Sequence, residues 1–428
     1  MNCRYCDERL EKTFSYGSVP MTPNAVEEGI LLKNGKPIEY ELAISVCKKC
    51  GLIQQFNSPD PSVLYFIFKN EIVGDIWEKH YFEFSDFIAY QKFDGVKILE
   101  VGGGDLSLAE RLLKKGIDKI EVIEKNIKTE NFSEGINVFK GFLEDYNKSS
   151  KFDLVYSSHV LEHIDNVQEH IEKISTLLTK NGRLIFSLPH FEKWIEDFAT
   201  NSFSQEHVTY PTIENLSAIL RSKGFIIDRV YQFRDHSIFM DAIFTDEQNN
   251  IKKSEQENEI YEKNLKLVTK FFENFEKLGI YLKNSIGDSE TYVFGANSGT
   301  QLLLKKYLKN SKIIGILDNS SLKSGKLLYG FNYVVNKPEI LTDIENIEEK
   351  KLIICTGKYV QEIKKQIKKI NDKIKINRKM FLIQNQEKPI FLNTFLAEDG
   401  NIFSLKIDIS TKEMLEFKKF NVKDLINN

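Results

Sequence analysis

Four cysteines near the N-terminus form two CxxC pairs, Cys3 with Cys6 and Cys47 with Cys50. Each pair can place two sulfurs on one tight turn, and four thiolates complete the tetrahedral shell that zinc prefers. Gly51 follows the second pair, and a glycine permits such a turn because it lacks a Cβ. Four thiolates leave no position for water, so we expect a structural zinc site. The alternatives are a redox motif or two unrelated thiol pairs.

A glycine turn flanked by two acids is the second feature that indicates a chemical function, because it could bind a ligand. The segment KILEVGGGDLSLAERLLKKG has the pattern of an apolar strand, a turn and an amphipathic helix. The backbone of Gly102, Gly103 and Gly104 can pass close to a ligand, and the helix amides then face that ligand. Glu124, at the end of the next expected strand, can accept hydrogen bonds from both ribose hydroxyls.

A nicotinamide dinucleotide also fits a glycine turn with a later acid. The third glycine of GxGxxG is absent here, however, and Glu100 stands just before the turn. A carboxylate at that place suits the positive sulfonium and amino group of S-adenosylmethionine, whereas it would repel a pyrophosphate. We therefore expect S-adenosylmethionine as the cofactor. A glycine-rich turn without a ligand is the remaining alternative.

The elements that must position these residues alternate between strands and helices. Apolar runs predict a mostly parallel sheet with an antiparallel pair at one end, at 96–101, 119–123, 154–157, 183–188, 225–232 and 238–245. A helical pattern precedes the first run, and a long amphipathic helix follows the polar segment 246–257. A second alternating region has expected strands at 292–294, 313–317 and 352–355. The tail from about 387 to 428 has the pattern of a hairpin and a helix.

Composition and charge narrow the possible partners. The 428 residues are 41% hydrophobic and 28% charged, which is typical of a globular chain of two or three domains. A net charge of -3 gives no strong field that favours nucleic acid or an anionic membrane. No apolar run reaches the roughly 18 residues of a membrane span, and no apolar secretory signal opens the sequence. We therefore expect a cytoplasmic protein whose partner is a small molecule.

The motifs ILEVGGGDLSLAERL, VIEKN, FDLVYSSHVLEHIDN and GRLIFSLP, in this order, resemble those of class I S-adenosylmethionine-dependent methyltransferases. The resemblance implies a Rossmann-like α/β core in which Glu100, Gly102 and Gly104 line the methionine part of the cofactor and Glu124 holds its ribose. It also implies further cofactor contacts, with Phe142 and Leu143 beside the adenine and with Ser158 and His159 just beyond the fourth strand.

A wider resemblance covers nearly the whole chain. The CxxC pairs, the core motifs and the later segments VFGANSGTQLLL, GILDNSSLKSGKLLYG, VVNKPEIL and LIICTGKYVQEI are similar to the zinc-containing sugar C-methyltransferases of deoxysugar biosynthesis. That family methylates carbon 3 of dTDP-linked 4-keto sugars. The resemblance implies a zinc module at 1–60, a methyltransferase domain with its N-terminal helix at 61–245, a helical linker at 246–290 and a second Rossmann-like domain at 291–428.

The last of these regions carries Gly295, Gly299 and Asp318, which resemble the turn and strand-end acid of a dinucleotide fold. Such a domain would either help to hold the nucleotide sugar or have a purely structural role.

The reactive segment of that family reads approximately Tyr-x-Glu-His. Here FSQEHVTYPT keeps Glu206 and His207 but has Ser204 in place of the tyrosine. A second family tyrosine is replaced near Phe68, and the glycines of a His-Gly-Gly motif are absent after His236.

We predict His207 as the catalytic base, because histidine has an ordinary pKa of roughly 6.5. Glu206 is the expected orienter or second proton carrier, and His163 is the second candidate base. The alternatives are a helix cap for His163 and an ordinary surface pair for Glu206 with His207. His190 and His236 are candidate substrate contacts.

The expected activity is therefore methyl transfer to a nucleotide-linked sugar, at carbon, through a base-generated enolate. The missing tyrosines favour O- or N-methylation of a related nucleotide sugar as the alternative. A non-catalytic cofactor-binding protein is the third possibility.

Overall fold

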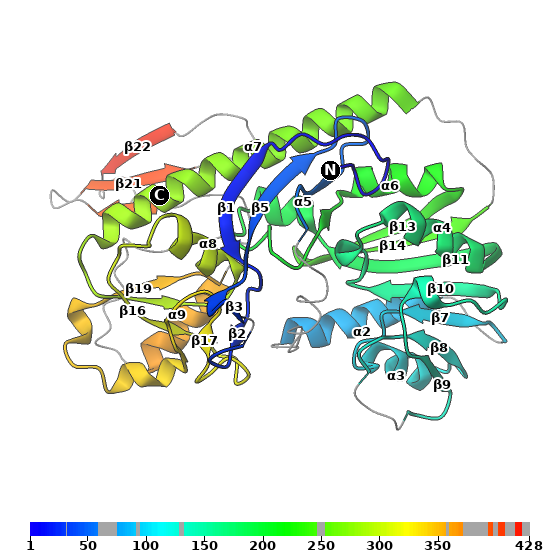
Figure 1. Ribbon diagram of the computed structural model, residues 1–428, viewed down its shortest axis with the longest axis horizontal. Helices are drawn as coiled ribbons and strands as arrows, with labels where there is room; N and C mark the ends of the chain where they lie inside the picture. The colour runs from blue at the N-terminus through cyan, green and yellow to red at the C-terminus, as the bar shows by residue number, and fades with distance from the viewer. Residues whose placement is uncertain are drawn as a thin grey trace.

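The computed structural model describes residues 1–30, 32–58, 75–90, 95–127, 132–245, 253–356 and 359–370, with three short strands in the tail. The fold is mixed α/β and contains two largely parallel sheets, joined along one side by a long helix (Figure 1). Within the described residues, no helix combines the length and apolar character needed to cross a bilayer.

The larger sheet has seven strands in the order β13-β14-β11-β10-β7-β8-β9. Its parallel part consists of β7 (Ile98–Val101), β8 (Ile120–Ile123), β9 (Ile136–Phe139), β10 (Phe152–Ser158) and β11 (Leu178–Pro189). The strands β14 (Ser237–Phe244) and β13 (Phe225–Phe233) add the expected antiparallel pair. Sequence analysis missed β9, because this short edge strand is only partly buried and lacks a continuous apolar run.

Alternating residues of the parallel strands face two layers of helices. Ile98 packs on the side of α2 (Asp75–Ala89) and α3 (Ser107–Lys114). Leu99 packs on the side of α4 (Val167–Leu177) and α6 (Ile213–Ser222). Both faces of the sheet are therefore buried, as a parallel sheet requires. The helical pattern predicted before the first strand, over 61–93, corresponds to α2, and residues 61–74 and 91–93 lie outside the described part.

The N-terminal region forms an antiparallel sheet with β1 (Phe14–Pro20), β5 (Glu39–Val46) and β6 (Ile53–Gln55). Its fourth strand, β12 (Thr209–Tyr210), comes from the chain that follows the large sheet. A separate pair joins β2 (Ala25–Val26) to β17 (Leu327–Leu328), and a small hairpin joins β3 (Leu32–Lys33) to β4 (Lys36–Pro37). The N-terminal residues thus pair with both of the other regions.

The second parallel sheet has the order β18-β16-β15-β19. Its strands are β15 (Thr291–Phe294), β16 (Ile313–Leu317), β18 (Val335–Asn336) and β19 (Lys351–Ile354), and its helices are α8 (Ser298–Lys306) and α9 (Val360–Ile370). The tail forms three antiparallel strands, β20 (Asn393–Leu396), β21 (Asn401–Lys406) and β22 (Glu416–Asn421). The tail was expected to contain a hairpin and a helix. Its described residues form the hairpin β20–β21, and β22 pairs with β21.

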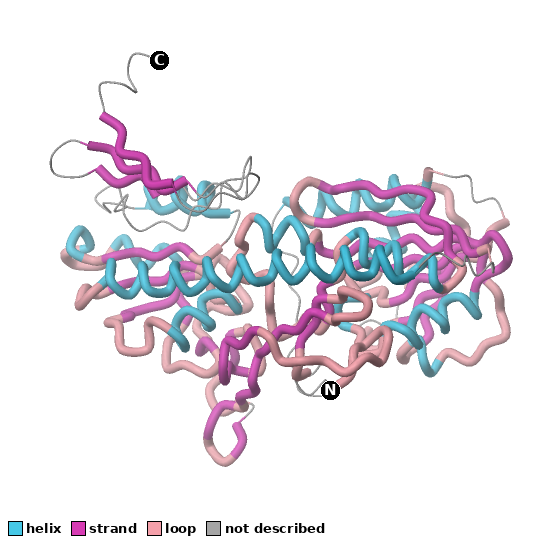
Figure 2. The backbone as a smooth tube through the Cα atoms, turned by 90° about the horizontal axis from the view of Figure 1, so that it is seen from above, coloured by secondary structure: helices cyan, strands magenta, loops and turns pink. Residues whose placement is uncertain are grey.

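Helix α7 (Lys253–Ile286) runs along both sheets, as Figures 1 and 2 show. Its buried face contributes Phe271 and Phe275 to one apolar core, which also contains Leu42 of β5, Phe203 and Val293 of β15. The N-terminal strands, the chain before β12 and the second sheet are therefore packed around one helix. A short α-helix, α5 (Phe191–Glu196), follows β11. Four 3-10 turns complete the described elements: η1 (Leu143–Asp145), η2 (Leu161–His163), η3 (Pro338–Thr342) and η4 (Ile347–Glu349).

Candidate active site and thiol cluster

The four cysteines meet in one cluster. Cys3 Sγ lies 3.6 Å from Cys50 Sγ, and Cys6 Sγ lies 3.5 Å from Cys47 Sγ. Four sulfurs at about 2.3 Å from a central ion would be separated by roughly 3.8 Å, so the cluster has the dimensions of a tetrahedral metal site. Gly51 adopts φ +71°, and a Cβ there would lie 2.5 Å from Ile260 Cγ2. The second turn therefore needs glycine both for its conformation and for its contact with α7.

The glycine turn after β7 is tightly packed on its protein side. A Cβ on Gly102 would lie 2.4 Å from Val160, and a Cβ on Gly103 would lie 2.3 Å from Val122. Gly102 and Gly104 have φ values of +77° and +54°, which glycine tolerates best. A Cβ on Gly104 would meet nothing within 4 Å, so this glycine borders open space. These contacts fit a backbone that a ligand approaches closely.

Glu124 lies where a ribose contact was predicted. Its Oε2 accepts a hydrogen bond from the Gly104 amide at 2.9 Å, and its Oε1 accepts one from the Asn126 amide at 2.7 Å. The two amides fix the carboxylate at the end of β8. Each oxygen keeps a second lone pair with which it can accept from a sugar hydroxyl.

Glu100 is a buried acid beside the same turn. It is 2% exposed, and Tyr156 donates a hydrogen bond to its Oε2 at 3.0 Å. Burial is the main cause that raises the pKa of Glu100 to about 8, against the opposing effect of the Tyr156 hydrogen bond. A nearby cation would favour the ionised carboxylate. The residues of the turn therefore fit a cationic, ribose-containing ligand such as S-adenosylmethionine.

The other predicted cofactor residues follow the next strands of the same sheet. Phe142 is half-buried with Lys125 Nζ 4.0 Å from its ring centroid, whereas the Leu143 side chain is buried in the core. Ser158 Oγ lies 3.3 Å from Ser187 Oγ at the end of β10. His159 has φ +54°, a conformation that non-glycine residues rarely adopt. Such strain at a strand end is typical of a functional position.

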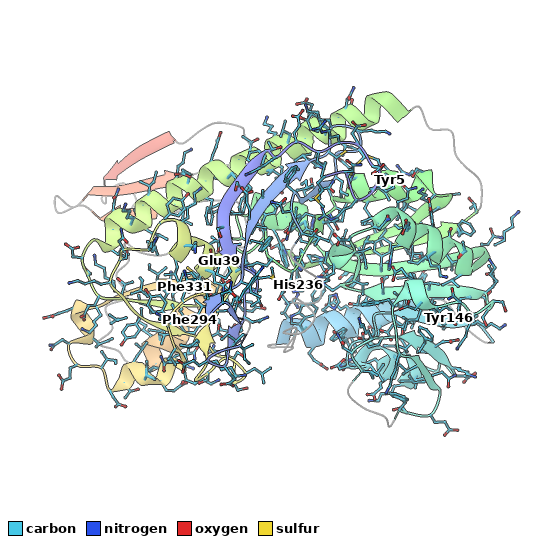
Figure 3. The ribbon with its side chains drawn as sticks, viewed as in Figure 1. Tyr5, Glu39, Tyr146, His236, Phe294 and Phe331 are labelled. Carbon is cyan, nitrogen blue, oxygen red and sulfur yellow. The ribbon has the colours of Figure 1, made fainter. Side chains whose placement is uncertain are left out.

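Three histidines and a tryptophan form a ring cluster at this end of the sheet. The Trp77 ring centroid lies 5.3 Å from His80, 4.8 Å from His159 and 5.0 Å from His236. Ser237 Oγ lies 3.1 Å from His159 Nε2 and 2.6 Å from His236 Nδ1. Burial lowers the pKa of His80 to about 2 and that of His159 to about 3. The His80 and His159 rings are therefore neutral at physiological pH. His236 lies toward the middle of the molecule (Figure 3).

His207 and His163 lie together next to a buried acid. Their ring centroids are 5.0 Å apart, and ligand-type atoms of Glu162, His163 and His207 all lie within 4.8 Å of one another. Glu162 is fully buried, and burial raises the pKa of its carboxyl to about 7. Neither Glu162 oxygen has a hydrogen-bond partner within the described part, although His159 Nδ1 lies 3.1 Å from Oε1.

The His207 imidazole is directed into this group. Its ring also lies 5.4 Å from Phe191, and burial lowers its pKa well below the ordinary value. Among the described residues, His207 Nδ1 is a buried atom without a hydrogen-bond partner. A neutral imidazole with an open nitrogen can accept a proton from a substrate.

Two alternatives raised by the sequence are wrong. His163 does not cap a helix, because α4 is capped by Asn166, whose Oδ1 accepts from the Glu169 amide at 3.1 Å. Glu206 and His207 are both half-buried and are not a surface pair.

Glu206 points away from His207, toward the N-terminal and C-terminal regions. Burial raises the pKa of Glu206 to about 7, while Lys323 and a hydrogen bond from Asn24 act in the opposite direction. Over the described ranges, no hydrogen bond joins the side chains of Glu206 and His207. The geometry thus favours Glu206 as a second proton carrier over an orienter of His207.

His190 is placed at the start of α5, where its Nδ1 accepts a long hydrogen bond of 3.5 Å from the Lys193 amide. It is 7% exposed, so substrate contact stays a prediction.

The glycine turn of the second sheet faces protein. A Cβ on Gly299 would lie 2.6 Å from Thr200 Oγ1. Asp318 accepts hydrogen bonds from the Ala296 amide at 2.8 Å and from the Ser320 amide at 2.9 Å. The helix start is therefore covered by the chain around Thr200, which favours the structural role for this turn.

Sequence analysis missed several residues of the site. Glu162 could have been noticed as an acid within an otherwise apolar motif, HVLEHI. No local pattern marked Trp77 as a site residue, because an aromatic residue on an amphipathic helix is normally predicted to belong to the core. Gln55, whose side-chain amide donates to the His207 carbonyl at 2.6 Å, was also missed, since a lone glutamine has no characteristic spacing.

Comparison with known proteins agrees with this geometry. A family model described as a methyltransferase domain matches residues 77–230. The chain is 22% identical over 364 residues to the C-methyltransferase NovU of Streptomyces niveus, which covers 79% of this chain and 86% of that protein. It is 27% identical over 163 residues to the mitochondrial ubiquinone biosynthesis O-methyltransferase of Arabidopsis thaliana, and that match covers 33% of this chain and half (50%) of the relative's length.

Among solved structures, the N-methyltransferase NodS of Bradyrhizobium japonicum, in complex with S-adenosylhomocysteine, is similar at 14% identity. The match has a TM-score of 0.35 and covers 43% of this chain and 97% of that chain. A putative S-adenosylmethionine-dependent methyltransferase of Listeria monocytogenes is similar at 15% identity, with a TM-score of 0.32 and coverage of 38% and 99%.

The seven-stranded sheet, its glycine turn and the family match define the class of protein. The chain carries a class I S-adenosylmethionine-dependent methyltransferase domain. Within that class, NovU matches the chain well beyond residues 77–230, since the similarity covers 79% of the chain.

Proposed function

We propose that this protein transfers a methyl group to carbon of a nucleotide-linked sugar, with His207 as the base. The observation that carries the proposal is the His207 imidazole, whose buried Nδ1 is open and which lies beside His163 and the acid Glu162. This group is close to the cofactor turn in the fold, because Val160 of the same motif packs on Gly102.

When bound, S-adenosylmethionine supplies an electrophilic methyl group. Gly102 to Gly104, Glu100 and Glu124 would hold it at the ends of β7 and β8. His207 takes the proton from the carbon beside a substrate ketone, and the electron pair of that C–H bond moves into an enolate. The Glu162 carboxylate, once ionised, stabilises the imidazolium that results. The ring cluster of Trp77, His80, His159 and His236 helps to exclude water from the reacting atoms.

The sugar substrate is supported by the extent of similarity to NovU, which covers 86% of that protein. We further propose that the four-cysteine cluster holds a structural zinc ion. The cluster has the donor set and dimensions that this ion takes, and all four thiols belong to turns that anchor the N-terminal sheet.

O- or N-methylation of a related nucleotide sugar is the second candidate. The similarity to an O-methyltransferase over 163 residues supports it, as does Ser204 in place of the family tyrosine. Carbon and heteroatom methylation are separated by mass spectrometry and NMR of the product. A methyl carbon attached to oxygen or nitrogen would contradict the C-methyl assignment.

The proposed base is tested by His207→Ala with a panel of nucleotide sugars. We expect turnover to fall by about 100-fold or more, as for loss of a general base, with cofactor affinity largely kept. Thr179→Ala, at the far end of β11, serves as a control. Wild-type turnover in His207→Ala would remove His207 from the mechanism.

A further inference from the structure

The backbone of the segment Ser204–His207 is held from several directions. The Gln55 side-chain amide, from β6 of the N-terminal sheet, donates to the Ser204 carbonyl at 2.8 Å and to the His207 carbonyl at 2.6 Å. His163 Nδ1 lies 2.8 Å from the Glu206 carbonyl oxygen. The segment that carries the proposed proton carriers is thus fixed by the N-terminal sheet and by the methyltransferase core.

The C-terminal region adds a third contact through one buried glutamine. Gln301, on α8, accepts a hydrogen bond from Gln205 Nε2 at 3.0 Å through its Oε1. Its own Nε2 donates to the carbonyls of Thr22 and Tyr329, each at 2.9 Å. Both glutamines are fully buried. Since both donors and the acceptor of the Gln301 amide are engaged, it can occupy only one orientation.

The Gln301 amide is linked by hydrogen bonds to the reactive segment, which distinguishes it from a residue that only packs. Gln205 is the immediate neighbour of Glu206, and its Nε2 also donates to the Pro20 carbonyl at 3.1 Å. A buried amide that is satisfied in one arrangement rigidifies its surroundings more than an apolar contact does. Loss of Gln301 would remove its hydrogen bonds to the Thr22 and Tyr329 carbonyls and to the Gln205 amide, and the chain at 204–207 would be free to shift.

We propose that Gln301 of the C-terminal region is a positioning residue for methyl transfer, acting through Gln205 to hold Glu206 and His207 in place. The inference rests on the proposed function of these two residues. It gives the second sheet a role in catalysis that does not require it to bind a nucleotide. A shift of about 1 Å in a reacting group can lower a rate by about 100-fold, so such a contact has a measurable effect.

Lys323 supports the same role for this region. Its Nζ donates to the Ala296 carbonyl at 2.7 Å, and its charge lowers the pKa of Glu206 against the effect of burial. The C-terminal region therefore acts on both the position and the charge of the reactive segment.

The test compares Gln301→Leu with Gln366→Leu in the full-length protein. Gln366 is the matched control, because it lies on α9 of the same region and bonds only to the exposed Asn319 within the described contacts. Hydrogen–deuterium exchange is measured on peptides that cover residues 204–208 and on peptides that cover the cofactor turn. We expect faster exchange at 204–208 in Gln301→Leu alone, with the turn and the affinity for S-adenosylmethionine unchanged.

Steady-state kinetics supply the second measurement. We expect kcat to fall about 10- to 100-fold in Gln301→Leu, with little change in the KM for S-adenosylmethionine. Gln205→Leu should give a similar loss, and the loss in the double variant should be much smaller than the sum of the two single losses, because the Gln205–Gln301 hydrogen bond is removed in all three. Gln301→Glu, which can accept from Gln205 but cannot donate to both carbonyls at neutral pH, should fall between wild type and Gln301→Leu.

Unchanged exchange at 204–208 in Gln301→Leu would overturn the inference, whatever the turnover. Additive losses in the double variant would overturn it too, as would a loss of kcat matched by Gln366→Leu. Absence of methyl transfer in the wild-type protein with every nucleotide sugar would instead count against the proposed function, and the exchange experiment would still decide whether Gln301 fixes the segment.

Discussion

At the scale of single residues, two carboxyls should set the pH dependence of turnover: Glu162, which lies beside the His207 imidazole, and Glu206, the half-buried neighbour of His207 in the chain. Burial raises the pKa of both Glu206 and Glu162 to about 7. Each is protonated below that pH and ionised above it. His207 stays neutral throughout this range, because its pKa is lowered by burial and by the nearby histidines. Since the proposed reaction needs an ionised acid beside the imidazolium, kcat should rise as the pH increases through about 7.

The expected profile is checked by measuring kcat between pH 5.5 and 8.5 under saturating substrates. Glu206→Gln and Glu162→Gln each remove one ionisation, so each should lower kcat at high pH and flatten part of the rise. Glu169→Gln, on the exposed start of α4, is the control and should keep the wild-type profile. A kcat that declines through pH 7 in the wild type would contradict this assignment.

Glu100 should couple cofactor binding to proton release. Its pKa of about 8 means that most molecules carry a proton there at pH 7. A bound cation favours the ionised form, so binding of S-adenosylmethionine should expel this proton. Calorimetry at pH 7 in buffers with different ionisation enthalpies measures the release.

Glu100→Gln should abolish that proton release and weaken binding by roughly 10-fold or more, since a charge-assisted contact is lost. Glu110→Gln, an acid in the first turn of α3, is the control. The same number of protons released by the wild type and by Glu100→Gln would show that another group is responsible.

At the scale of elements, the second cysteine turn holds two helices to the N-terminal sheet. Asn215 of α6 donates to the Cys50 carbonyl at 2.6 Å, and Asn264 of α7 donates to the Gly51 carbonyl at 2.8 Å. Both asparagines are almost fully buried. The turn is thus an attachment point for both helices as well as half of the proposed metal site, and its disruption should destabilise both helices.

Cys47→Ser should therefore lose bound zinc and lower the melting temperature by roughly 5 °C or more, because the metal-binding free energy contributes to folding. Metal content is measured by elemental mass spectrometry and stability by thermal unfolding. Cys355→Ser changes a buried thiol that follows β19 and lies outside the cluster, so the metal content of this variant should match that of the wild type. Full zinc content in Cys47→Ser would refute the structural site.

At the scale of the whole molecule, α7 runs along both parallel sheets and packs in one core with the N-terminal sheet and the second parallel sheet. Gly279 lies where this helix approaches the C-terminal region, and a Cβ there would lie 2.2 Å from the Tyr307 ring. The close approach is possible only because the side chain is absent. In an isolated helix, by contrast, alanine would be favoured over glycine by about 1 kcal/mol.

Gly279→Ala should thus destabilise the protein by about 1–2 kcal/mol, since the overpacking penalty exceeds the gain in helix propensity. Ile280→Ala, at a neighbouring position that is 50% exposed, should change stability by less than about 0.5 kcal/mol. Denaturant unfolding measures both. A more stable Gly279→Ala would mean that α7 and the Tyr307 helix end are not in close contact.

Local patterns were sufficient for much of the fold. The strands at Ile98–Val101, Ile120–Ile123 and Phe152–Ser158 were predicted from apolar runs. Such runs are visible in the sequence because strands that are buried on both faces contain few polar residues. The short strands β9 and β12 were missed, since neither contains a continuous apolar run. For the tail, a hairpin and a helix were predicted, whereas its described residues form three antiparallel strands, including Glu416–Asn421.

The sequence by itself determined the features that depend on neighbouring residues: two cysteine turns, a glycine bend between a strand and a helix, and an acid at the end of the following strand. Only the tertiary structure decided the surroundings of Glu206 and His207. Their side chains face different parts of the molecule, and their partners come from distant positions such as Asn24, His163 and Lys323. Burial and proton affinity depend on those distant partners, and no local spacing encodes them.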